Sequence, residues 1–168
     1  MKDIAELLQQ QPFAQGLESG VIELMAGCAT NVVYQANEYV FREGDPSDYF
    51  YLIRHGTVAL EMFLPGRGAH NFLTLKTGEI LGSAWLIPPY RWTYDARAVE
   101  LTRALAFECK CLRDKCEADH HVGYELMKRF MPPLLERLQM AQLQCIDMYG
   151  NGNAGANNSG GGKVPTNA

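Results

Sequence analysis

The N-terminal segment carries apolar side chains at helical spacing. Ile4, Leu7 and Leu8 fall on one face of a helix, and Asp3 stands where it can cap the first turn. Pro12 ends this pattern, because proline lacks the backbone N–H that a helix interior needs. A second stripe at helical spacing is then formed by Leu17, Val21, Leu24 and Met25. The sequence therefore predicts two helices before residue 31.

From Asn31 onward the apolar positions recur with a period of two, which is typical of strands. The predicted strands are VVYQ, EYVFR, YFYLIR, GTVALEMF, FLTL, DARAV and ALAFE. Turn sequences separate them, among them EGDPSD at 43–48, PGRG at 65–68 and KTGE at 76–79. Many short strands joined by Gly- and Pro-containing turns indicate an antiparallel barrel or roll.

After Phe107 the period returns to that of a helix. LRDKCEAD, at 112–119, predicts a short helix, and Asp119 can cap a longer one that runs to about Tyr149. The longer segment carries a heptad stripe formed by Met127, Met131, Leu134, Leu138, Ala141, Cys145 and Met148. Pro132 and Pro133 are expected to kink or restart the helix. Two interpretations of the stripe stay open: it covers the open face of the roll, or it also pairs with a second copy in a dimer.

The segment from Asn151 to Ala168 contains almost nothing that a core could bury. It is rich in Gly and Asn, and it predicts a flexible tail. We therefore expect one folded domain, residues 1–150, followed by the tail.

The composition is that of an ordinary globular domain, with 47% apolar and 20% charged residues. The formal net charge of −4 argues against a surface that neutralises nucleic-acid phosphates. No apolar run is long enough for a membrane span, and the N-terminus lacks a secretory signal. We therefore expect a cytoplasmic protein that binds neither nucleic acid nor membrane, and whose five cysteines are reduced thiols.

Four segments carry a resemblance to a known family: PFAQGL at 12–17, YVFREGDPSDYFYLIRHGTVAL at 39–60, KTGEILG at 76–82 and ARAVELTRALAFE at 96–108. Over about residues 10–150 the chain resembles the cyclic-nucleotide-binding domain family, including the sensor half of bacterial catabolite-activator and fumarate–nitrate-regulator proteins. The resemblance implies a mainly β fold: a jelly-roll-like antiparallel β-roll of about eight strands, with N-terminal helices and a long C-terminal helix. The helix-turn-helix domain of the family's regulators has no counterpart in this sequence.

The resemblance also implies a ligand site. In family members that bind cyclic AMP or cyclic GMP, a Gly-Glu pair opens a short helix that faces the cyclic phosphate, and an Arg further on pairs with it. Matching the flanking motifs puts Ser83 in place of that Glu and Trp92 in place of that Arg, with Arg91 next to it. The candidate ligand-binding residues are Gly82, Ser83, Ala84, Trp85, Arg91, Trp92, Thr93 and, on the long helix, Gln142.

Two readings of this altered loop stay open. Loss of a charged hydrogen-bond partner costs roughly 1.5–3 kcal/mol, so tight binding in the usual pose is not expected. Trp85, Tyr90, Trp92 and Tyr94 crowd the loop with aromatic rings, which can stack on a base or fill the cavity. The chain is thus expected to sense a cyclic nucleotide or related anion and to signal through its C-terminal helix to a protein partner. The alternative is a ligand-free adaptor with the same fold.

No residues form a catalytic constellation, so no enzyme is expected. Cys109, Cys111 and Cys116 lack the spacing of a zinc or iron–sulfur site, and no metal is expected. A second alternative is a thiol-based redox sensor that uses these three cysteines, because the neighbouring basic residues Lys110, Arg113 and Lys115 can lower a thiol pKa.

Overall fold

The structure, a computed structural model, describes residues 3–152, with side chains described through residue 147. The chain divides into two compact units, residues 1–130 and 131–168. The elements, with η for 3-10 turns, are α1 (Ile4–Gln9), η1 (Pro12–Ala14), α2 (Ser19–Ala26), β1 (Ala29–Tyr34), β2 (Tyr39–Phe41), β3 (Tyr49–His55), β4 (Thr57–Leu64), β5 (Gly68–Lys76), β6 (Ile80–Leu81), η2 (Ala84–Leu86), β7 (Asp95–Ala98), β8 (Thr102–Glu108), α3 (Cys109–Ala118) and α4 (His120–Gly152).

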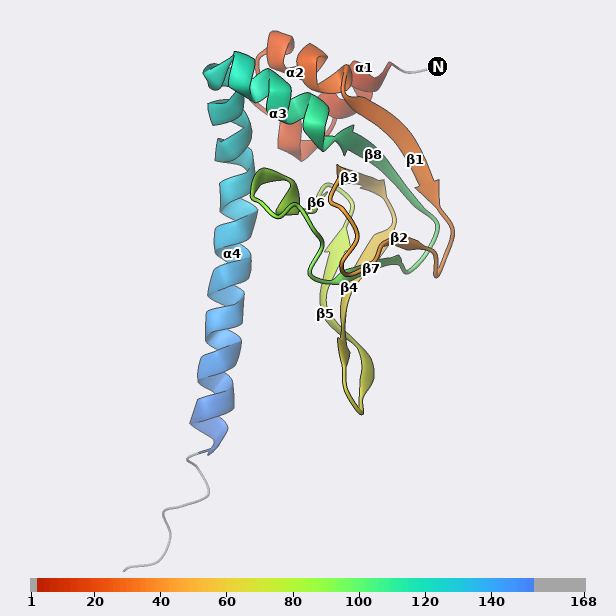
Figure 1. Ribbon diagram of the computed structural model, residues 1–168, viewed down its shortest axis with the longest axis vertical. Helices are drawn as coiled ribbons and strands as arrows, with labels where there is room; N and C mark the ends of the chain where they lie inside the picture. Colours follow the sequence, from red (N-terminus) through yellow and green to blue (C-terminus); the bar gives the residue numbers. More distant parts are fainter. Residues whose placement is uncertain (1–2, 153–168) are drawn as a thin grey trace, which may run out of the picture. The chain divides into compact units, whose positions relative to one another are not determined.

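The described strands form two four-stranded antiparallel sheets. Their orders are β1-β8-β3-β6 and β2-β7-β4-β5, so the chain crosses repeatedly between the sheets. Helices α1, α2 and α3 gather at the end of the roll where β8 ends, and the β4–β5 hairpin projects away from them (Figure 1). This is the β-roll with N-terminal helices and a long C-terminal helix that the sequence predicted. Strand β6 was missed, because two residues are too few to show a period.

Alternate residues of β3 face two different hydrophobic clusters. Phe50 and Leu52 pack in the helix-side cluster, which contains the buried residues of α1, α2, α3 and the start of α4. Tyr51 and Ile53 face the opposite way, into the roll-interior cluster between the two sheets. Strand β3 is therefore buried on both faces, and the roll interior is a core of its own.

Both helix caps predicted from the sequence are confirmed. The Asp3 carboxylate accepts a hydrogen bond from the Ile4 amide at 2.7 Å, at the start of α1. The Asp119 carboxylate accepts one from the His121 amide at 2.9 Å, at the start of α4. Among the described helices, none has both the length and the apolar character needed to cross a membrane.

The heptad stripe does not cover the roll at the start of α4, so that interpretation is wrong there. Val122, Leu126 and Phe130 are the residues that α4 buries in the first unit. Met127, the first residue of the heptad stripe, is 39% exposed. The helix has apolar residues on two adjacent faces, and the more regular of the two stripes is not the buried one.

Helix α4 does not restart at the two prolines, because it continues through Pro132 and Pro133; the expected kink stays a prediction. The boundary between the two compact units nevertheless falls directly before them, after Phe130. The predicted domain boundary at residue 150 lies inside α4. The predicted tail, apart from the last two residues of that helix, lies outside the described residues.

Candidate functional site

The loop singled out from the sequence, residues 78–93, leaves β6 and returns toward β7. Its first turn is made by Gly82, whose φ of 103° lies in the left-handed region that favours glycine. Ser83 follows, and then the three-residue turn η2. The loop next passes the cis Pro88–Pro89 bond and reaches Arg91, which forms an isolated antiparallel bridge with Pro46.

Trp92 lies inside the roll. Its side chain is 3% exposed and belongs to the roll-interior cluster. The indole stacks on Phe41 of β2, with ring centroids 3.8 Å apart and planes 7° from parallel. Tyr94 lies beside it at 6.3 Å, and Phe41 also stacks on Tyr51 at 6.3 Å. Aromatic rings of this chain thus occupy the space between the two sheets.

The turn at 43–48 holds the backbone of Trp92 from both sides. The Trp92 amide donates to the Asp45 carbonyl at 3.0 Å, and the Trp92 carbonyl accepts from the Gly44 amide at 2.8 Å. Ser47 adds a third bond, from its amide to the Tyr90 carbonyl at 2.8 Å. The E-G-D turn, which carries much of the family resemblance, therefore fixes the residue that fills the interior.

Gly82 and Trp92 fit each other. A Cβ atom built at Gly82 would collide with Cη2 of the Trp92 indole, so no larger residue fits there without displacement of the ring. In the implied family site, the backbone at Gly82 begins the segment that faces the cyclic phosphate. Here the indole of Trp92 lies against that backbone.

The remaining candidate residues lie in different surroundings. Ser83 is half-buried, and Ala84 packs against the roll-interior cluster. Trp85 is 1% exposed but belongs to the helix-side cluster, where it stacks on Phe50 at 5.1 Å and meets Phe130 edge-on at 5.5 Å. Its indole N–H is buried without a hydrogen-bond partner among the described residues.

Arg91 is exposed, and its guanidinium donates to the Gly44 carbonyl at 2.6 Å. Thr93 is exposed as well, and Gln142 is an exposed residue of α4 in the second unit. Of the eight candidates, the structure brings Gly82, Ala84 and Trp92 together at the roll interior. A role of any of the eight toward a ligand stays a prediction.

Sequence reasoning missed Phe41, Tyr34 and Tyr51 as interior residues. Burial raises the pKa of the Tyr51 phenol far above its ordinary value, and the hydrogen-bonded Tyr34 adds to the shift. Both phenols stay neutral at physiological pH. The only signal in the sequence was the aromatic content of the strands, which does not reveal the direction in which each ring points.

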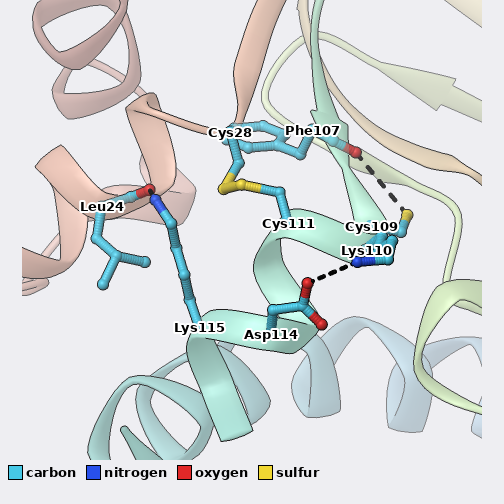
Figure 2. The surroundings of a disulfide bond; sticks show 8 residues. All are labelled: Leu24, Cys28, Phe107, Cys109, Lys110, Cys111, Asp114 and Lys115. Atoms are coloured by element: carbon cyan, nitrogen blue, oxygen red, sulfur yellow. Dashed lines mark hydrogen bonds and ion pairs between the residues drawn. A yellow bond between two sulfur atoms is a disulfide. The ribbon is translucent and has the colours of Figure 1, made fainter. Parts of the chain in front are cut away.

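The expectation of reduced thiols is wrong for two of the five cysteines. Cys28 and Cys111 form a disulfide with Cα atoms 5.8 Å apart (Figure 2). Their sequence separation of 83 residues gives no local spacing from which the pair could be recognised. The fold joins them, because the Glu108 amide donates to the Cys28 carbonyl at 2.8 Å, just before α3 begins.

Cys109 and Cys116 are free thiols. Burial raises the pKa of Cys109 to about 12, and burial also raises the pKa of Cys116. These two residues are therefore poor nucleophiles at neutral pH. Among the described residues, no group of three or more His, Cys, Asp or Glu side chains is arranged to hold a metal ion.

Helix α3 contacts the candidate loop directly. The Arg113 guanidinium donates to the Trp85 carbonyl at 2.8 Å and lies over the Tyr90 ring, 4.4 Å from its centroid. One side chain of α3 thus holds both ends of the segment 85–90. Sequence reasoning had considered this arginine only as a neighbour of cysteines.

Comparison with known proteins gives a matching family model, the cyclic nucleotide-binding domain, over residues 31–119. Cyclic nucleotide-gated ion channel 18 of Arabidopsis thaliana is 28% identical over 117 residues, which cover 64% of this chain and 17% of the channel. The cAMP-dependent protein kinase regulatory subunit of Schizosaccharomyces pombe is 35% identical over 81 residues, which cover 48% of this chain and 19% of the subunit. The chain spans less than a fifth of the length of either relative.

Among solved structures, a putative cyclic nucleotide-binding protein from Geobacter metallireducens superposes with a TM-score of 0.70 at 25% identity. The match covers 80% of this chain and 97% of that one. The matched region of the family model begins in β1 and ends just after α3, so it includes nearly all of the roll and the loop that carries Trp92. The chain belongs to the cyclic nucleotide-binding domain family.

Proposed function

We propose that this chain is a regulatory module whose roll interior is filled by its own Trp92, so that it works as a protein-binding adaptor without a cyclic nucleotide in the family's usual pose. The observation that carries the proposal is the buried indole, stacked on Phe41 and lying against Gly82. A ligand placed there would have to displace it. The two named relatives, a gated channel and a kinase regulatory subunit, support a regulatory role and give no reason to expect catalysis.

The chemistry of the loop supports the same proposal. An anionic phosphate in the interior would need a cation, and the family position for that cation is Trp92. The adjacent Arg91 is bound to the Gly44 carbonyl and exposed. An unpaired anion buried beside the indole would be strongly unfavourable. Ser83 carries no charge with which to replace the family's Glu.

Exposed apolar residues on α4 support a protein partner. Among the side chains of the second unit that the structure describes, the exposed large apolar ones are Met131, Leu135, Leu138, Met140, Leu143 and Ile146. A helix with so many exposed apolar residues is typical of a helix that pairs with another protein surface. A second copy of the chain, joined through the predicted heptad stripe, is the simplest such partner.

The test is thermal unfolding of the wild type and of Arg91→Ala with cyclic AMP and cyclic GMP. A ligand at about 100 times its dissociation constant would add about 2.7 kcal/mol, or several degrees in Tm. We expect neither cyclic AMP nor cyclic GMP to shift the Tm of the wild type or of Arg91→Ala. A shift in the wild type that disappears in Arg91→Ala would instead support the competing hypothesis of nucleotide sensing through a displaced arginine.

A gain-of-function variant provides the positive control. Ser83→Glu combined with Trp92→Arg restores the two charged groups that the family site uses and removes the indole. We expect this double variant to gain a nucleotide-dependent rise in Tm. A shift of equal size in the wild type would contradict the proposal.

A further inference from the structure

The Cys28–Cys111 disulfide fastens two elements that the chain joins only through the whole roll. Cys28 lies between α2 and β1, and Cys111 lies in the first turn of α3 (Figure 2). Lys115 adds a weaker link between the same elements, because its ammonium group donates to the Leu24 carbonyl at 2.8 Å. Helix α3 is thus attached to the C-terminal end of α2 and the residues just after it by one covalent bond and one hydrogen bond.

The same helix holds the loop that leads to Trp92. Arg113, two residues beyond Cys111, donates to the Trp85 carbonyl and lies over the Tyr90 ring. The Tyr90 carbonyl in turn accepts a hydrogen bond from the amide of Ser47. Ser47 belongs to the turn at 43–48, which also forms the two backbone hydrogen bonds to Trp92. A continuous series of contacts therefore runs from the disulfide, through α3, to the residue that fills the roll.

The disulfide is within reach of a reductant on one side. Cys28 is 6% exposed, whereas Cys111 is half-buried, so Cys111 is the more exposed residue of the pair. Exchange with an external dithiol breaks the S–S bond and leaves two protein thiols, while the dithiol is oxidised to its own disulfide. Internal shuffling to Cys109 or Cys116 is disfavoured, because both are poor nucleophiles at neutral pH.

We propose that the Cys28–Cys111 disulfide is a redox-operated clamp that holds α3 in place and, through Arg113, keeps Trp92 inside the roll. The proposal rests on the proposed function, in which Trp92 fills the interior. It also replaces the three-cysteine sensor considered from the sequence with a different pair. Reduction by a dithiol breaks the covalent link, so that of these two links only the Lys115 hydrogen bond still joins α3 to α2. The loop at 85–92 then becomes looser.

The test uses the fluorescence of Trp92 in a Trp85→Phe background, because the chain contains only two tryptophans. Acrylamide quenching is measured on the air-oxidised protein, after treatment with dithiothreitol, and after re-oxidation. We expect the quenching constant of Trp92 to rise on reduction, because the loop at 85–92 becomes looser, and to return to its starting value on re-oxidation. Mass spectrometry of the alkylated protein confirms the state of Cys28 and Cys111 in each sample.

Three variants separate the clamp from other effects. Cys28→Ser is expected to give the reduced value under all conditions, and Cys145→Ser, which removes an exposed free cysteine, should keep the full response. Arg113→Met should raise the quenching of Trp92 in the oxidised protein and abolish the change on reduction. If a variant fails to fold, the proposal is tested on the unsubstituted protein. Hydrogen exchange of residues 85–92 is then compared between its oxidised and reduced forms.

Equal quenching and equal hydrogen exchange in the oxidised and reduced protein would overturn the proposal, as would five free thiols in the air-oxidised protein. Failure of the proposed function has a different signature. In that case a cyclic nucleotide raises the Tm of the oxidised wild type, whatever the quenching experiment shows.

Discussion

Trp92 is the residue of the candidate loop whose side chain lies inside the roll. Its position was predictable from the matched motifs, and so was the alternative that its ring fills the pocket. The residues that pack against the Trp92 ring were not predictable. The side to which Phe41 points depends on a register shift between β2 and β7, which the sequence does not reveal. The sequence also did not show that Trp85 and Trp92 pack in two different clusters, because both residues lie in one short loop.

Trp92→Ala tests the packing of the interior at the level of one side chain. Removal of a fully buried Trp costs roughly 3–5 kcal/mol through lost burial and the cavity left behind. We expect a fall of that size in the free energy of unfolding, measured by urea denaturation. The exposed neighbour Thr93→Ala should change it by no more than about 0.5 kcal/mol. A loss below about 1 kcal/mol for Trp92→Ala would mean that the ring is not part of the core.

The free cysteines give a second test at this scale. Burial raises the pKa of Cys109 to about 12, so its reactive thiolate is scarce at neutral pH and increases as the pH approaches that value. With iodoacetamide at about pH 8, exposed Cys145 should be alkylated first and Cys109 last. Peptide mass spectrometry follows each site over time. Equal rates at the two residues would show that Cys109 is not buried as described.

At the scale of elements, the strands were predictable and the helix faces were not. Short runs rich in β-branched and aromatic residues, bounded by Gly and Pro turns, indicated every described strand longer than two residues, because these residue types favour strands. In α4 the pattern misled, since the buried residues Val122, Leu126 and Phe130 recur every fourth position beside a more regular stripe. The disulfide could not be predicted for another reason: Cys28 and Cys111 are 83 residues apart in the sequence and lie close together only in the folded roll.

Reduction of the disulfide should destabilise the first unit as a whole. A cross-link that closes a loop of 83 residues removes on the order of 4 kcal/mol of chain entropy from the unfolded state. We expect the free energy of unfolding of the reduced protein to be lower by roughly 2–5 kcal/mol in urea titrations. Cys116→Ser, which leaves the disulfide intact, serves as the control. Identical midpoints with and without dithiothreitol would contradict the bond.

At the scale of the whole molecule, the chain has the family's roll and long helix, while the matched motifs predict Ser83 and Trp92 in place of the two charged residues of the family site. The fold could be recognised from the sequence, because turn residues and strand patterns are local. The state of the pocket could not, because it depends on which of several aromatic rings points inward. The exposed apolar residues of α4 then carry the prediction about assembly.

Leu138→Lys tests assembly through α4. Leu138 is 55% exposed and belongs to the predicted heptad stripe, so in a helix-paired dimer it would lie in the interface. We expect light scattering to give a dimer mass for the wild type and a monomer mass for this variant. Gln139→Lys adds the same charge beside the stripe and should leave the dimer intact. A wild type that is monomeric at every concentration would rule out this partner.

The most direct test of the central claim follows the two indole N–H signals in a ¹H–¹⁵N NMR spectrum, with Trp92→Phe to assign them. Cyclic AMP or cyclic GMP is added in millimolar excess. If Trp92 fills the roll and no nucleotide enters, its indole signal stays where it is. A saturable shift or loss of that signal on titration would mean that a nucleotide reaches the interior and that the account is wrong.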